Sequence, residues 1–370
     1  MSTTNFYGGS DGGGYYPLPA TTGTPIGYTD GVPFFVSGTH TISPIESVKK
    51  IMGYNYGYMA NRREYRNPAA VQSQEKMFDL GINWVCLPVV NWQDTYHSTN
   101  IYSDHLATPT DRDVAAFIEL SHKRGKKVCL KPIVESKDHM WRAHIGFPDL
   151  NMEDMDVYWK TWFISYKNFL LHYAELAQEL NVEMFCIGCE MLGTEHRKYD
   201  WLYLIDEVRR VYKGKIIYNT NHDHEDSQQW FDVLDYIGTS AYYPVGGEKR
   251  TYEEMCKNWI EVRYRLDAIA KDRNKQYIFM EIGCRSVEEA STHPWDFTEV
   301  LKWDEEEQAN FYRSCLDTFL PSPYFAGVFW WDWPTFIYND RAAAEQDKGF
   351  SIHLKKAEQV VKEYNQKFSK

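Results

Sequence analysis

The run Met184-Phe-Cys-Ile-Gly-Cys-Glu190 is short, apolar and closed by a glutamate, and Gln276-Tyr-Ile-Phe-Met-Glu281 repeats this pattern further along the chain. Apolar runs of this length are typical of buried β-strands. In a barrel of parallel strands, side chains at the C-terminal strand ends lie on one face. Whether Glu190 and Glu281 meet therefore depends on the strands and helices around them.

Eight apolar runs alternate with eight helical patterns over residues 46–370. This alternation predicts parallel strands, right-handed crossovers and a single α/β domain, a (β/α)8 TIM barrel. A doubly wound open sheet is the alternative, but no G-x-G-x-x-G motif follows any of these runs. The predicted strands are 51–55, 84–90, 127–134, 184–190, 215–219, 236–243, 276–281 and 326–331. The predicted helices include 67–80, one that follows Thr110, 154–180, 200–212, 251–272, 304–319 and 353–367.

Residues 1–45 are rich in Gly, Thr, Ser and Pro and are predicted to form an irregular extension of the barrel. The N-terminus shows neither the basic nor the apolar segment of a secretory signal, which predicts a cytoplasmic protein and leaves unconventional export open. No apolar run approaches the roughly 20 residues of a membrane span. The formal charge of −12 disfavours nucleic acids and anionic membranes as partners and favours a neutral one.

The seven cysteines are odd in number and lie mostly in apolar runs, so we expect reduced, buried thiols. Cys186 and Cys189 form a C-x-x-C, but an odd offset along a strand predicts thiols on opposite faces. His222 and His224 are two apart in a loop, and spacing fixes no third ligand. We therefore predict neither a metal nor a cofactor.

Two carboxyl groups at one barrel mouth are the equipment for hydrolysing a glycosidic bond. The acid/base is held protonated by burial or by its charged neighbour, while the nucleophile stays ionised. The alternative is structural, with either glutamate paired to a barrel cation such as Lys131. The 13 Trp and 27 Tyr suit a sugar-binding surface and ordinary core packing alike.

Four segments carry a resemblance to a known family over residues 48–366. They are Phe185-Cys-Ile-Gly-Cys-Glu190, Gly238-Thr-Ser-Ala-Tyr-Tyr-Pro244, Phe279-Met-Glu-Ile-Gly283 and Gly327-Val-Phe-Trp-Trp-Asp332. The chain resembles the clan of (β/α)8 retaining glycoside hydrolases with glutamates on strands four and seven, and within it the family 113 β-mannanases. This resemblance implies that Glu190 is the acid/base and Glu281 the nucleophile.

One position departs from the clan's pattern. Many members carry Asn immediately before the acid/base, where it binds the sugar 2-hydroxyl, and this chain has Cys189, a weak donor. Asn219 and Asn221 after the fifth strand are the candidates to replace that contact. Tyr242 matches the clan's tyrosine that hydrogen-bonds the nucleophile.

Other candidate binding residues surround these strand ends. Trp330 or Trp331 forms the floor under the sugar; alternation turns one inward and the other toward the helices, and we favour Trp330. Lys131 either contacts a substrate hydroxyl or neutralises a carboxylate. The cleft walls are predicted to include Asn91, Trp92 and Tyr96 after the second strand, His222 after the fifth and Trp295 after the seventh.

The predicted activity is hydrolysis of β-1,4-mannosidic bonds in mannan or manno-oligosaccharides, with a neutral oligo- or polysaccharide as substrate. A β-glucan or a bacterial polysaccharide cleaved by the same mechanism is the first alternative, because loops set substrate choice on a shared barrel. A non-catalytic carbohydrate-binding barrel is the second. Both glutamates weigh against it, since a pure binder needs neither. Endo or exo action and the oligomeric state are left open.

Overall fold

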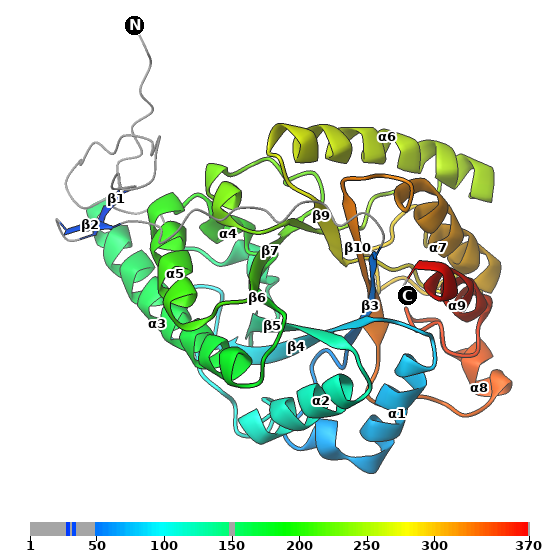
Figure 1. The fold of residues 1–370 in the computed structure, drawn as a ribbon, viewed down its shortest axis with the longest axis horizontal. Coiled ribbons are helices and arrows are strands. Elements are labelled where there is room, and N and C mark those ends of the chain that lie inside the picture. Colours follow the sequence, from blue (N-terminus) through cyan, green and yellow to red (C-terminus); the bar gives the residue numbers. More distant parts are fainter. Residues whose placement is uncertain (1–26, 30–31, 35–48, 148–151, 369–370) are drawn as a thin grey trace, which may run out of the picture.

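The computed structural model describes residues 27–29, 32–34, 49–147 and 152–368. Eight parallel strands close into a barrel in the order β10-β3-β4-β5-β6-β7-β8-β9 (Figure 1). The predicted (β/α)8 barrel is therefore confirmed. The strands are β3 (Ile51–Tyr56), β4 (Trp84–Gln93), β5 (Lys127–Ser136), β6 (Met184–Cys189), β7 (Lys215–Asn221), β8 (Ile237–Ser240), β9 (Tyr277–Glu281) and β10 (Phe325–Trp333).

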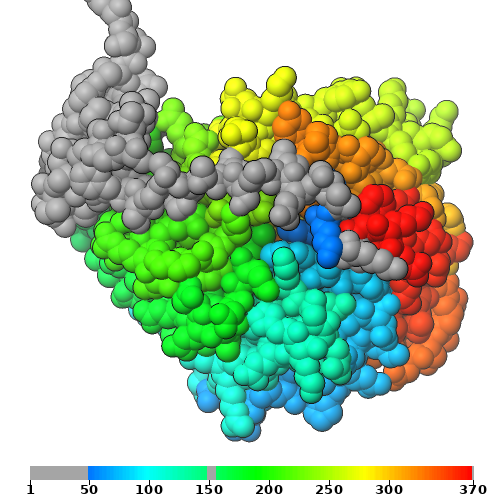
Figure 2. All heavy atoms as spheres, in the orientation of Figure 1, coloured from blue at the N-terminus to red at the C-terminus, as the bar shows by residue number. Residues whose placement is uncertain are grey.

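Helices surround the barrel, and the colours in Figure 2 pass round the molecule in sequence order. Several helices begin at side-chain caps: Asn67 accepts the N–H of Ala69 at the start of α1, and Thr110 forms a capping box with Asp113 at the start of α2. The helices are α1 (Pro68–Phe78), α2 (Asp111–Lys123), α3 (Met152–Glu179), α4 (Leu192–Glu195), α5 (Lys198–Val211), α6 (Tyr252–Asp272), α7 (Glu305–Phe319), α8 (Arg341–Gln346) and α9 (Lys356–Phe368).

The crossover from β7 to β8 corrects the prediction that every strand is followed by an α-helix. All of its residues are described, and they form only a 3₁₀ helix, Gln229–Val233. Trp230 and Phe231 of this helix are buried, and the Trp230 ring stacks on Trp201 of α5 at 4.8 Å. Two aromatic side chains thus fill the layer that a helix occupies elsewhere.

The predicted irregular extension, residues 1–45, lies mostly outside the described residues. Within it, β1 (Gly27–Thr29) pairs antiparallel with β2 (Val32–Phe34). Among the described helices, none combines the length and the apolar character needed to span a bilayer.

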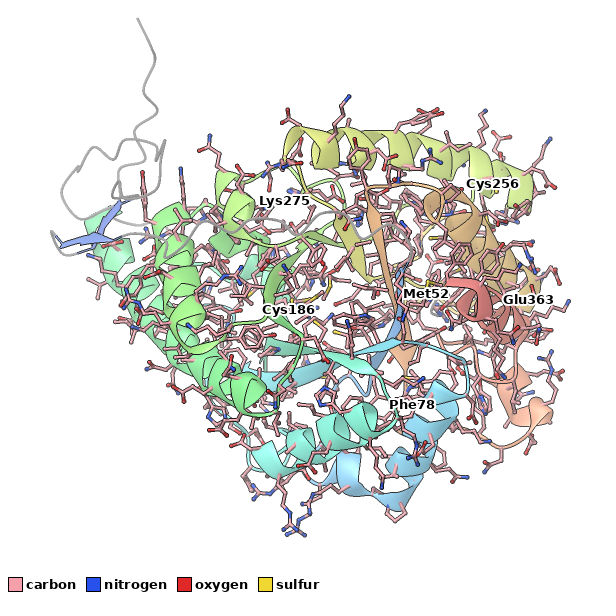
Figure 3. The ribbon with its side chains drawn as sticks, in the orientation of Figure 1. Met52, Phe78, Cys186, Cys256, Lys275 and Glu363 are labelled. Atoms are coloured by element: carbon pink, nitrogen blue, oxygen red, sulfur yellow. The ribbon has the colours of Figure 1, made fainter. Side chains whose placement is uncertain are left out.

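Apolar side chains pack on both sides of the strands. Those inside the barrel form one cluster that includes Ile51, Cys186 and Phe329, and a larger cluster joins the strands to the helices. Figure 3 shows Cys186 within the ring of strands, whereas Glu363 of α9 lies at the outside. The aromatic residues Trp162, Tyr166, Phe169 and Tyr173 of α3 belong to the outer cluster, so they are core residues.

A register shift in β6 changes which side chains face the barrel interior. Cys186 pairs with Ile217 and Cys189 with Asn219, so the two strands advance by different numbers of residues between these pairs. A bulge of this kind reverses the alternation of side chains beyond it. The prediction that the two thiols face opposite ways is therefore wrong: both lie on the inner side, and Cys189 reaches the barrel mouth.

Candidate active site

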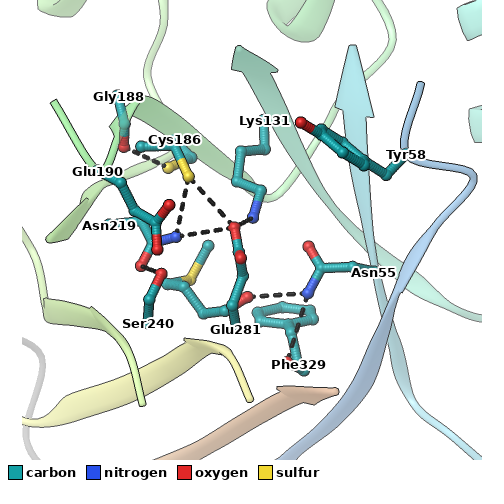
Figure 4. Close-up of polar contacts among 12 residues, drawn as sticks. Asn55, Tyr58, Lys131, Cys186, Gly188, Glu190, Asn219, Ser240, Glu281 and Phe329 are labelled. Atoms are coloured by element: carbon teal, nitrogen blue, oxygen red, sulfur yellow. Dashed lines mark hydrogen bonds and ion pairs between the residues drawn. The ribbon is translucent and has the colours of Figure 1, made fainter. Parts of the chain in front are cut away.

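Glu281 ends β9 and is only 3% exposed. Its Oε1 accepts hydrogen bonds from Lys131 Nζ at 2.6 Å, Asn219 Nδ2 at 3.2 Å and Cys189 Sγ at 3.2 Å (Figure 4). Its Oε2 accepts from the Tyr242 hydroxyl at 3.4 Å, the contact predicted for that tyrosine. Burial raises the pKa of Glu281, but the charges of Lys131 and Arg142 and the hydrogen bonds from Lys131 and Cys189 together outweigh it and leave the pKa below its ordinary value. Glu281 is therefore an ionised carboxylate.

Glu190 follows β6 with a φ of 53°, in the left-handed region that side chains other than glycine seldom adopt. Its N–H donates to the Asn219 carbonyl at 2.7 Å, which holds this conformation. Its Oε2 accepts from Arg142 Nη2 at 3.0 Å and from Trp141 Nε1 at 3.2 Å. Burial, and then the charge of Glu281, raise the pKa of Glu190 although Arg142 opposes them. The opposite shifts of these two pKa values thus favour the ionised form of Glu281 and the protonated form of Glu190.

Three residues at this mouth were missed by the sequence analysis. Glu135, near the end of β5, accepts hydrogen bonds from the Tyr58 hydroxyl at 2.6 Å and from Arg142. Trp141, which donates to Glu190, is 44% exposed. Glu135 was findable, because it directly follows the predicted strand 127–134. Trp141 and Arg142 lie at the start of a short 3₁₀ helix, Arg142–His144, which the strand pattern does not predict.

Lys131 is fully buried in its ion pair with Glu281, so of the two predicted roles it takes the neutralising one. Burial lowers the pKa of Lys131, but the charges around it, that of Glu281 first, together leave the pKa above its ordinary value, and the ammonium stays charged. The structural alternative, a glutamate paired with Lys131, is thus present at Glu281. This ion pair also keeps Glu281 in the ionised state that a nucleophile needs.

The two candidate asparagines differ in what they contact. The side-chain Nδ2 of Asn219 donates to Cys189 and Glu281, and its Oδ1 accepts from Ser240, so this side chain positions the carboxylate. Asn221 lies two residues further along β7, and its Oδ1 is buried with no hydrogen-bond partner among the described residues. Asn221 is therefore the better candidate to contact a sugar hydroxyl in place of the clan's asparagine.

The side chains of the two tryptophans of β10 have the reverse of the predicted orientations. Trp330 is buried and stacks on Tyr312 of α7 at 4.1 Å, so it faces the helices. Trp331 is partly exposed, lies 4.9 Å from the Tyr58 ring and is 5.6 Å from Lys131 Nζ. The choice of Trp330 as the floor residue is corrected to Trp331, because alternation along β10 turns only one of them inward.

Asn91 is a second correction. The hydroxyl of Tyr173 on α3 donates to Asn91 Oδ1 at 3.1 Å, so Asn91 faces the helix layer and not the mouth. Its neighbour Trp92 has the opposite orientation and packs with Val90 and Cys189 at the mouth. Trp92 therefore remains a candidate for the wall.

The loops after β7 and β9 meet through two predicted residues. The rings of His222 and Trp295 stack at 5.8 Å, and Trp295 is 45% exposed. Burial lowers the pKa of His222, which favours its neutral form. Across the described parts of the chain, no group of three or more His, Cys, Asp or Glu is arranged to hold a metal ion.

The fold and these two carboxyl groups define a glycoside hydrolase. The chain belongs to Glycoside Hydrolase Family 113, whose model matches residues 54–355. It is similar to the structure of the GH113 β-mannanase AaManA from Alicyclobacillus acidocaldarius in complex with ManMIm, with a TM-score of 0.80 and 32% identity. That match covers 88% of this chain and 99% of the other.

A GH113 β-1,4-mannanase solved as a complex is also similar, with a TM-score of 0.78, 31% identity and coverage of 86% of this chain and 99% of that one. A β-glucuronidase from Faecalibacterium prausnitzii shares the fold alone, at 14% identity and a TM-score of 0.57, over 86% of this chain and 49% of that one. None of the curated proteins matches the chain.

Proposed function

We propose that this glycoside hydrolase is a retaining β-mannanase that cleaves β-1,4-mannosidic bonds in mannan or manno-oligosaccharides. The observation that carries the mechanism is the opposite pKa shift of the two carboxyl groups, below the ordinary value for Glu281 and above it for Glu190. The mannoside preference is supported by the two GH113 mannanases, which are 31% and 32% identical to this chain.

In this mechanism Glu281 attacks the anomeric carbon while Glu190 protonates the leaving oxygen. The resulting glycosyl-enzyme is hydrolysed by a water molecule that Glu190, now ionised, deprotonates. The contacts of Glu281 suit this role, since Lys131 donates to one of its oxygens and Tyr242 to the other, which fixes the orientation of the carboxylate. Trp141 donates to Glu190, so it lies on the leaving-group side of the bond that breaks.

Product analysis on mannohexaose tests the substrate. We expect the wild-type protein to release mannose or short manno-oligosaccharides, and Glu281→Ala, run in parallel, to release none. Cellohexaose and xylohexaose serve as controls. If the protein cleaves one of these controls and leaves mannohexaose intact, its substrate is another β-glycan. If it binds an oligosaccharide but cleaves none of them, the result favours a carbohydrate-binding barrel. Proton NMR of the first product identifies the anomer, which must be β for retention.

Lys131→Met tests how the nucleophile is kept ionised. Without the ammonium, burial dominates, so the pKa of Glu281 rises. Activity requires ionised Glu281 and falls as the pH drops through that pKa. We therefore expect the acid limb of kcat/KM to move up by about one pH unit or more. Lys131→Arg keeps the charge and is the matched control; an acid limb that stays in place in Lys131→Met would contradict this role.

A further inference from the structure

Glu135 and Glu190 share one buried cation. Arg142 donates from Nη1 to Glu135 Oε1 and from Nη2 to Glu190 Oε2 at 3.0 Å. Its Nε donates to the Cys189 carbonyl at 3.0 Å, so acceptors on three sides fix the planar guanidinium. All of these side chains are buried. The charge of Arg142 is therefore divided between a carboxylate that the mechanism uses and one that it does not.

A count of charges shows why this division matters. The buried ion pairs at the mouth contain two cations, Arg142 and Lys131, and three carboxyl groups, those of Glu135, Glu190 and Glu281. Buried charge without a partner is unfavourable. The cluster is neutral when one of the three carboxyls carries a proton and carries a charge of −1 when none does. One protonated carboxyl is thus the favoured state.

The contacts decide which carboxyl carries the proton. Glu281 has Lys131 to itself, and its oxygens accept three further hydrogen bonds. Glu135 has the Nη1 contact of Arg142 and accepts from Tyr58, whose phenol stays neutral because burial and Glu135 raise its pKa. Glu190 shares Arg142 and accepts from Trp141, but it also faces the negative charge of Glu281, which raises its pKa.

We propose that Glu135 is a positioning residue that acts through Arg142 and makes Glu190 the carboxyl that holds the proton. This inference rests on the proposed function, in which Glu190 is the acid/base. The remaining groups that face Glu190 are uncharged: burial raises the pKa of both the Cys189 thiol and the Tyr242 phenol well above their ordinary values. The polar and titratable groups around it are Arg142, Trp141, Ser240, Glu281, Cys189 and Tyr242.

Glu135→Gln tests the proposal. The variant leaves two cations and two carboxyl groups, so both carboxyls ionise and Arg142 pairs with Glu190 alone. We expect the alkaline limb of kcat/KM for mannohexaose to move down by about one pH unit or more. A 2,4-dinitrophenyl β-mannoside, whose leaving group needs no proton, should keep its kcat/KM. Glu135→Asp, which retains the charge, should return the limb toward its wild-type position.

A purely structural role for Glu135 predicts something else: kcat/KM would fall by the same factor at every pH and for both substrates, which would overturn the proposal. Asp332 needs a control, because burial and then Asp347 raise its pKa to about 7, so its titration overlaps the same range. The shift caused by Glu135→Gln must persist when Asp332→Asn is also present. If the shift is absent when Asp332→Asn is also present, the titrating group is Asp332, and this result overturns the proposal as well.

Carbon-13 NMR of protein labelled at the glutamate carboxyls reads the same effect without substrate. The Glu190 resonance is the one that disappears in Glu190→Gln. We expect this carboxyl to titrate at lower pH in Glu135→Gln than in the wild type, and an unchanged titration would refute the proposal. If the wild type cleaves no β-mannoside, the proposed function fails, while the NMR titration still decides on Glu135.

Discussion

Glu281→Ala is expected to lower kcat for mannohexaose by roughly four orders of magnitude or more, the scale seen when a covalent nucleophile is removed. The reason is that the two other carboxyls of the buried ion pairs are engaged elsewhere: the raised pKa of Glu190 favours its protonated form, and Glu135 is held by Arg142 and Tyr58. Initial rates of reducing-end release, measured with the two proteins at equal concentration, give the ratio.

The same substitution also removes the partner of a buried lysine. Breaking a buried ion pair costs about 3–5 kcal/mol, so thermal unfolding must be measured beside the rates. Glu307→Ala is the matched control, because Glu307 is a buried carboxylate in α7 that accepts hydrogen bonds from Ser291 and the Glu289 N–H. We expect it to lose stability yet keep its kcat below its unfolding temperature. Equal loss of kcat in both variants would mean that Glu281 acts through the fold.

Rescue of Glu281→Ala by azide tests whether Glu281 is the nucleophile or the acid/base. In Glu281→Ala, azide can enter where the carboxylate stood and attack a 2,4-dinitrophenyl β-mannoside from the opposite side to the leaving group. The expected product is the α-mannosyl azide, identified by NMR. A β-mannosyl azide would instead assign to Glu281 the role of the acid/base.

The strand ends were predictable from the sequence because apolar runs of five to eight residues that alternate with helical patterns are most simply explained as buried strands. Glu190 and Glu281 follow from that count, since parallel strands bring their C-terminal ends together. Family resemblance then separated the acid/base from the nucleophile. Their opposite pKa shifts support this assignment. These shifts depend on Lys131 and on burial, and so on the three-dimensional structure, which the sequence pattern alone does not give.

Side-chain direction was less predictable, for a physical reason. Side chains alternate between the two faces of a strand, so one bulged residue reverses the face on which every later side chain of that strand lies. The bulge in β6 carries Cys189 to the mouth, and the misassignment of Trp330 came from choosing a parity that the sequence leaves open. Asn91 was placed in a loop, whereas β4 continues to Gln93 and turns Asn91 toward α3. Arg142 reaches the site from a short 3₁₀ helix between β5 and α3, which no strand periodicity predicts.

Glu190→Ala should separate substrates by their leaving groups. For mannohexaose the leaving oxygen needs a proton, so we expect kcat/KM to fall by about 10²–10⁴-fold, the usual contribution of a general acid. For a 2,4-dinitrophenyl β-mannoside the first step needs no proton and kcat/KM should change little. Measuring both substrates over a pH series adds a second test. Protonation of Glu190 is lost as the pH rises through its raised pKa, so the wild-type alkaline limb for mannohexaose should be absent from the activated substrate.

The second step of the reaction, hydrolysis of the glycosyl-enzyme, tests Glu190 as the general base. Without Glu190 no base activates water, so the glycosyl-enzyme formed by Glu281 should accumulate, seen as a burst of dinitrophenol and a lowered KM. Azide, which needs no base, should then raise the steady-state rate and yield a β-mannosyl azide, the anomer opposite to that from Glu281→Ala. A variant that lost kcat/KM equally on both substrates would point to a disturbed mouth around Arg142 and Trp141, since loss of a proton donor alone discriminates between leaving groups.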